Sequence, residues 1–166
     1  MATSEGAFLY IATYPDEVAA RADYEVVRDL HSIDAIGNFN VAVVTKDDKG
    51  KVHVDKDETA LRKGTWGGIA AGAVVGLLFP PSILASAATL GAAGGLAGHL
   101  WKGMSRSDVK ELGEVIDEGQ AALVVIGDLT VGEALKKANL RAVKEIRKEV
   151  NVNLDDMEKE IKNSGL

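Results

Sequence analysis

The side chains that could do chemistry in this chain are few and lie far apart. The chain has three histidines, His31, His53 and His99, and no cysteine. The histidines do not form a recognised zinc motif, and a chain without thiols has neither thiolate ligands nor disulfides. We therefore expect no metal site and no thiol chemistry.

Acidic and hydroxyl side chains do not combine into a catalytic arrangement either. The pairs Asp47–Asp48 and Asp155–Asp156 stand in a turn and at a helix start, where acids are favoured without any catalytic role. Ser105, Ser107 and Asp108 do not supply a nucleophile, a base and an orienting group together, and helix capping explains Ser107. The glycine-rich residues match neither the GxGxxG pattern nor a phosphate loop. The sequence thus predicts no enzyme, no nucleotide site and no cofactor.

The most informative feature is a Gly/Ala-rich segment between Lys63 and Lys102 that contains no Asp, Glu, Lys or Arg. Pro80–Pro81 divides this segment into two arms, because proline removes a backbone donor and clashes with the preceding helical turn. Small residues recur at every fourth position, on one face of each predicted helix, where two backbones can approach closely. We therefore expect a glycine-zipper helical hairpin. Its expected packing and oligomerisation positions are Gly64, Gly68, Gly72, Gly76, Ala87, Gly91 and Gly95.

The outer ends of the two arms favour contact with a membrane. Both tryptophans and several basic residues stand there, in the places of an aromatic belt and of cytoplasmic basic flanks. The expected membrane-interface residues are Arg62, Lys63, Trp66, Trp101 and Lys102. The hairpin would then anchor the protein, inserted shallowly or transmembrane, with both ends cytoplasmic. Gly and Ala contribute little apolar area, however, so burial of the hairpins between copies of the protein in a soluble assembly is an open alternative.

The remainder of the chain is charged and acidic overall. The 166 residues carry a formal net charge of −6, which disfavours binding to nucleic acid. The first residues lack the basic start and apolar run of a secretion signal, so we expect the protein on the cytoplasmic side of the cell membrane, or in the cytoplasm as a soluble assembly. The expected partners are copies of the protein itself and a lipid membrane; no small-molecule substrate is identified.

Apolar patterns place the secondary structure on either side of this segment. Strands are expected at 7–14, 39–46, 51–56 and 121–126, a first helix from Asp16–Glu17 to about Ala35, and a second helix at 107–119. The resulting order of elements predicts an α+β, ferredoxin-like (β-α-β-β-α-β) sheet with an inserted apolar helical hairpin. The expected domains are residues 1–59 with 105–128, the hairpin at 60–104, and a C-terminal extension at 129–166.

The C-terminal extension contains one ambiguous stretch. Residues 131–138 are predicted to be helical, whereas 144–152 fit either a helix or an alternating edge strand. A charged final helix is expected from Asn153. The basic residues of this region are interspersed with acids, which favours a solvated face over contact with lipid headgroups. They are Lys136, Lys137, Arg141, Lys144, Arg147 and Lys148.

The layout and two stretches of sequence resemble a known family. The Gly/Ala-rich run WGGIAAGAVVGLLFPP, continued by LGAAGGLAG, and the later ALVVIG strand are similar to the bacterial and archaeal family called domain of unknown function 1269. The resemblance implies membrane association and a strand at 144–152, but no activity. Together these observations predict a non-enzymatic, membrane-associated protein that self-associates through its glycine-rich hairpin.

Overall fold

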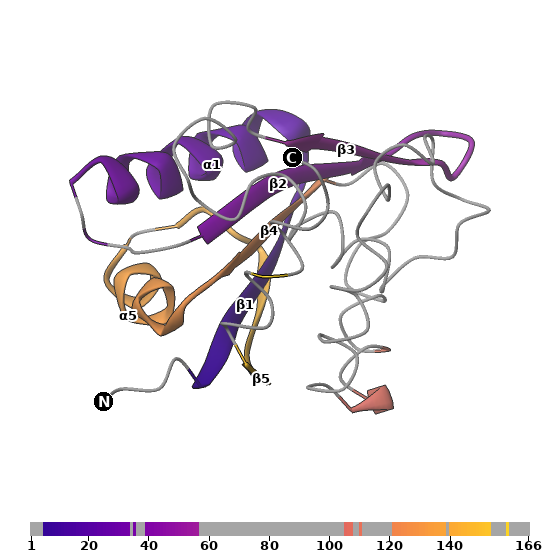
Figure 1. Ribbon diagram of the computed structural model, residues 1–166. Helices are drawn as coiled ribbons and strands as arrows, with labels where there is room; N and C mark the ends of the chain where they lie inside the picture. The colour runs from indigo at the N-terminus through magenta and orange to yellow at the C-terminus, as the bar shows by residue number, and fades with distance from the viewer. Residues whose placement is uncertain are drawn as a thin grey trace.

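The computed structural model describes residues 5–33, 35, 39–56, 105–107, 110, 121–138, 140–153 and 159. These residues form a five-stranded sheet, and two helices are described over their whole length (Figure 1). The strands and helices are β1 (Glu5–Tyr14), α1 (Glu17–Ser32), β2 (Phe39–Lys46), β3 (Val52–Lys56), β4 (Ala121–Gly127), α5 (Leu129–Lys137) and β5 (Lys144–Asn153).

The four strands expected at 7–14, 39–46, 51–56 and 121–126 are all present, within two residues at each end. The first helix begins as predicted. Asp16 caps it by accepting a hydrogen bond from the backbone N–H of Ala19 at 2.9 Å. It ends at Ser32, before the expected Ala35. The helix predicted at 131–138 corresponds to α5, whose cap is Asp128.

The predicted ferredoxin-like (β-α-β-β-α-β) fold is wrong, because the strands lie in a different order in the sheet. That prediction places β4 at an edge of the sheet and β3 inside it. The observed order is β3-β2-β4-β1-β5, with every neighbouring pair antiparallel. All seven residues of β4 are buried, which suits an inner strand, whereas the alternating charged residues of β3 suit an edge. A fifth strand, β5, extends this sheet, and the helix α5, which follows β4, packs on it.

The ambiguous stretch at 144–152 is a strand. β5 pairs antiparallel with β1, with Ile146 opposite Ile11 and Arg147 opposite Tyr10. The helix α5 connects β4 to β5, which are parallel to each other with β1 between them. In the same way, α1 connects β1 to β2, which are parallel with β4 between them. The two β-α-β units are therefore interleaved within one sheet.

Both described helices pack on the same face of the sheet. Alternate residues of the inner strands form one apolar cluster with side chains from α1 and α5, including Tyr14, Val27, Leu123 and Leu135. The opposite face is also buried, since Leu9, Ile11, Val124 and Ile126 are each at most 3 % exposed. The strands are thus buried on both faces, which explains their continuous apolar sequences.

The prediction of transmembrane helices is also corrected. Among the described residues, the helices lack the length and apolar character needed to cross a bilayer. The described chain is mostly sheet, and its helices α1 and α5 are charged elements that cover that sheet. The helical hairpin expected at 60–104 lies outside the described residues, as do most of the helix expected at 107–119 and the charged final helix.

Candidate functional site

The residues singled out from the sequence lie mostly outside the described part of the chain. This applies to all seven glycine-zipper positions, to the five expected membrane-interface residues, and to His99 and Asp155–Asp156. His53 is described and faces Asp47, with 2.8 Å between Nε2 and Oδ2. This hydrogen bond and two from backbone N–H groups hold the pKa of Asp47 below its ordinary value. The described residues contain no cluster of three or more metal-ligating side chains.

The structure brings together a different set of polar residues, beneath and beside the two helices. Asp23 of α1 is completely buried. Its Oδ2 accepts hydrogen bonds from the hydroxyl of Tyr14 and from the backbone N–H of Arg141, each at 2.7 Å. The Arg141 guanidinium donates to Oδ1 at 3.2 Å. These donors compensate a carboxylate that would otherwise be costly to bury, and they tie α1 to β1 and to the segment before β5.

A second polar group lies farther along the edge of the sheet. The Tyr10 hydroxyl donates to Glu145 Oε2 at 2.9 Å, and Arg147 Nε donates to Glu145 Oε1 at 3.1 Å. The Arg147 guanidinium also lies over the Tyr10 ring, 5.2 Å from its centroid. Burial raises the pKa of Tyr10, and its hydrogen bond to Glu145 raises it further. Tyr10 therefore stays protonated as a donor, and the Arg147 side chain is held in one orientation.

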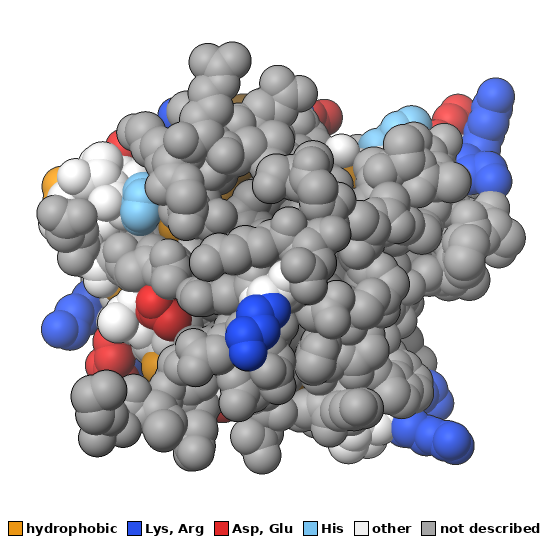
Figure 2. Space-filling model, in the orientation of Figure 1, with side chains coloured by type: hydrophobic (Ala, Val, Ile, Leu, Met, Phe, Trp, Pro, Cys, Tyr) orange, Lys and Arg blue, Asp and Glu red, His pale blue; other side chains and the backbone are white. Residues whose placement is uncertain are grey.

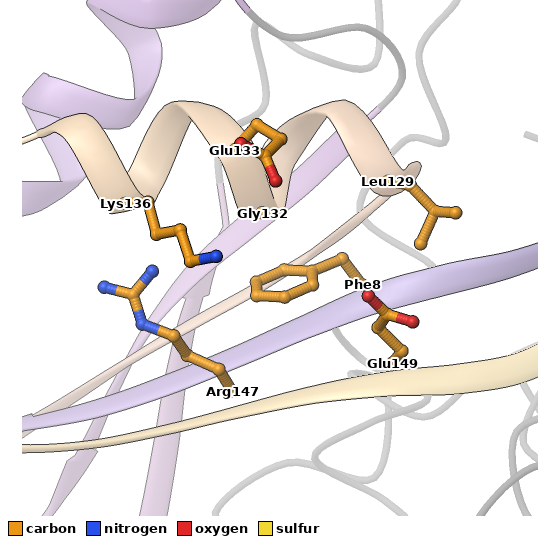
Figure 3. A pocket seen from close by; sticks show the side chains of 7 residues that line it. All are labelled: Phe8, Leu129, Gly132, Glu133, Lys136, Arg147 and Glu149. Carbon is orange, nitrogen blue, oxygen red and sulfur yellow. The ribbon is translucent and has the colours of Figure 1, made fainter.

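Beyond Arg147, a hollow of about 210 Å³ opens between α5 and the strands β1 and β5 (Figure 3). Its sides are formed by Lys136 and Glu133 from α5 and by Arg147 and Glu149 from β5. The apolar surface comes from Phe8 and Leu129. The hollow thus combines two basic, two acidic and two apolar side chains.

Gly132 determines how closely α5 approaches β1 at this hollow. A Cβ added to Gly132 would lie 2.9 Å from Cδ2 and Cε2 of Phe8, closer than side-chain atoms normally come. The helix can therefore lie directly over the Phe8 ring only because this position has no side chain. Figure 3 shows the ring beneath Gly132, with the charged side chains around it.

The surface around this region mixes both signs of charge. In the orientation of Figure 2, acidic and basic side chains lie close together at the lower left, where Figure 1 places α5. The sequence predicts a solvated face for Lys136 and Arg147 and does not indicate the roles of Asp23, Glu145 or Phe8. Asp23 and Glu145 bind partners 118 and 135 positions away in the sequence, so these contacts required the tertiary arrangement.

Comparison with known proteins gives one match. A family model described as "Protein of unknown function (DUF1269)" matches residues 65–162. Neither the curated proteins nor the solved structures contain a match.

Proposed function

The chain belongs to the DUF1269 family of proteins of unknown function, and from this premise we propose that it is a non-enzymatic protein that attaches to the cytoplasmic surface of a membrane and self-associates. In this proposal the sheet domain is the cytoplasmic part, and the uncharged residues 64–101 make the contact with lipid. The attachment is peripheral.

The observation that carries this proposal is the contrast between the two parts of the chain. Residues 64–101 contain no Asp, Glu, Lys or Arg, while charged residues make up 27 % of the whole chain. Trp66 and Trp101 stand at the two ends of the uncharged residues, and basic side chains follow directly outside them. Indole rings favour the boundary between headgroups and hydrocarbon, and basic side chains favour anionic headgroups.

The sheet topology supports attachment from one side. The last residue of β3 pairs with Ala42 of β2, and the first residue of β4 pairs with Thr45 of β2. Residues 57–120 therefore connect the two strands that flank β2. Both ends of the uncharged segment are therefore tethered to one folded domain. A segment tethered in this way can touch a bilayer while the sheet domain stays on a single side of it.

A soluble self-assembling scaffold is the second candidate. It is favoured by the ten-residue edge strand β5, which among the described strands pairs only with β1. An edge strand presents backbone groups that can pair with another copy of the chain. In that case the uncharged residues would be buried between subunits rather than in lipid.

Liposome flotation of the full chain, purified without detergent, separates the two candidates. The only tryptophans are Trp66 and Trp101, so intrinsic fluorescence reports directly on the ends of the uncharged segment. We expect the protein to float with anionic vesicles. We also expect a blue-shifted emission that is quenched more by bromine near the headgroups than by bromine near the bilayer centre.

Paired substitutions supply the control. Changing Val74 and Val75 to aspartate places two charges inside the uncharged segment and should abolish flotation. Changing Val18 and Val143 to aspartate adds the same charge at positions that are 79 % and 75 % exposed on the sheet domain, and should leave flotation intact. Equal loss in both variants, or large lipid-free particles that remain at the bottom of the gradient, would contradict membrane attachment; the particles would favour the scaffold.

A further inference from the structure

The hollow between α5 and β5 carries an inference that is independent of the proposed membrane attachment. We propose that it binds a small zwitterion, a free α-amino acid with an apolar side chain. The carboxylate lies between Lys136 and Arg147, and the ammonium lies near Glu133 and Glu149.

The basic side of the hollow, formed by Lys136 and Arg147, is preorganised to bind a carboxylate. Arg147 is held by its ion pair with Glu145 and by the face of Tyr10, so its guanidinium needs no reordering when a ligand enters. Figure 3 shows the Lys136 ammonium next to the Phe8 ring, with the Arg147 guanidinium on the same side of that ring. An anion bound beside these two cations would be attracted by each of them.

One nitrogen of the Arg147 guanidinium, Nη1, is buried and has no hydrogen-bond acceptor within the described part of the chain. A buried charged donor without an acceptor is unfavourable. Nε and Nη2 of Arg147 already face Glu145, so Nη1 is the nitrogen left to donate to one oxygen of a carboxylate. These two properties select a carboxylate for this side of the hollow.

The two acidic side chains of the hollow supply the complementary charge. Glu133 projects from α5, and Figure 3 places the Glu149 carboxylate on the other side of the Phe8 ring from Arg147. A simple anion would be repelled by these two carboxylates, and a simple cation would be repelled by Lys136 and Arg147. A molecule that carries both charges avoids both repulsions.

The size and the apolar lining restrict the ligand further. A hollow of about 210 Å³ is smaller than the roughly 300–1,000 Å³ of pockets that hold drug-sized molecules. Leu129 is 44 % exposed, and with Phe8 it offers apolar surface beside the charged side chains. An apolar amino-acid side chain would cover that surface, and the gain would be hydrophobic.

The test is an NMR titration of the full chain with L-leucine, followed at the Gly132 amide and the Arg147 Nε–H. 4-Methylpentanoate, which lacks the ammonium, and isopentylamine, which lacks the carboxylate, are titrated in parallel. We expect saturable shifts with leucine in the millimolar range or below, and about tenfold weaker binding of each analogue. Equal binding of either analogue, or no saturable shift with leucine, would overturn the proposal.

Two lysine variants show whether binding occurs in this hollow. Lys136→Gln should weaken leucine binding about fivefold or more, because it removes one of the two cations. Lys137→Gln is the matched control: it is the next residue of the same exposed helical turn and does not line the hollow, so it should bind as the parent chain does. Equal binding by both variants would place the ligand elsewhere and refute the assignment. Flotation of Lys136→Gln is expected to be unchanged, which separates failure of this site from failure of the membrane proposal.

Discussion

Replacing Tyr14 by phenylalanine removes a single oxygen from the most buried polar cluster of the protein. The Tyr14 hydroxyl donates at 2.7 Å to Asp23, whose side chain is fully buried. Asp23 keeps two further donors, the backbone N–H and the guanidinium of Arg141. The substitution therefore removes one of the three hydrogen-bond donors to the Asp23 carboxylate.

The expected loss follows from this geometry. A hydrogen bond to a buried charged group contributes about 1.5–3 kcal/mol to the free energy of unfolding. Because Arg141 still compensates part of the charge, we expect Tyr14→Phe to lower the free energy of unfolding by about 2 kcal/mol. For a chain of this length that corresponds to a fall in melting temperature of about 4–8 °C.

Urea unfolding followed by far-ultraviolet circular dichroism measures this loss. The measurement is repeated at several protein concentrations, so that self-association is separated from folding. Tyr24→Phe is the matched control, since Tyr24 is only half-buried on α1 and lies outside the Asp23 cluster. A double-mutant cycle with Asp23→Asn isolates the pairwise energy. A coupling below about 0.5 kcal/mol, or a loss no larger than that of Tyr24→Phe, would refute the reasoning.

Two further predictions concern the same face of the sheet. Burial raises the pKa values of Tyr10 and Tyr14, and their hydrogen bonds, to Glu145 and to Asp23 respectively, raise them further. The stability that these tyrosines contribute is therefore fully present below pH 10 and is lost as the pH rises above it. The free energy of unfolding should fall by up to about 2.7 kcal/mol per pH unit there, and alkaline denaturation of Tyr14→Phe should show a shallower slope; identical slopes would contradict the prediction. Alanine in place of glycine usually stabilises a helix by about 1 kcal/mol. Gly132→Ala should instead lower the melting temperature, because the new Cβ would lie 2.9 Å from the Phe8 ring. Combining it with Phe8→Leu should recover part of the loss, and failure to recover would show that the clash is not the cause.

Local patterns were sufficient to locate most of the elements. The run Ala121–Gly127 is apolar throughout, and β2 is rich in valine, so both were recognisable as strands without knowledge of their neighbours. The acidic pair Asp16–Glu17 marked the start of α1 in the same local way, whereas the cap of α5, Asp128, lies three residues before the predicted start of that helix. These signals depend on a few adjacent residues and on the period of the chain.

The arrangement of the elements could not be obtained in this way. The stretch Lys144–Asn153 is mostly charged or polar, and the spacing of its few apolar residues fits a helix as well as an edge strand. The family resemblance implied a strand, and the pairing with β1 establishes it. The prediction ended the sheet at β4 and assigned its second helix to 107–119. The candidate site depends on the same long-range contact, since Tyr10 meets Glu145 across 135 positions of sequence.

The position of β1 in the middle of the sheet has a consequence for synthesis on the ribosome. β1 is the first strand to be translated, yet both of its neighbours, β4 and β5, lie in the last third of the chain. Phe8 pairs with Glu149, 141 positions later, which at ordinary elongation rates means a wait of roughly 7–28 s. During that interval an apolar strand emerges without either of its partners. A nascent chain that stalls before Ala121 would therefore expose β1 to chaperones, because neither β4 nor β5 has been made at that point.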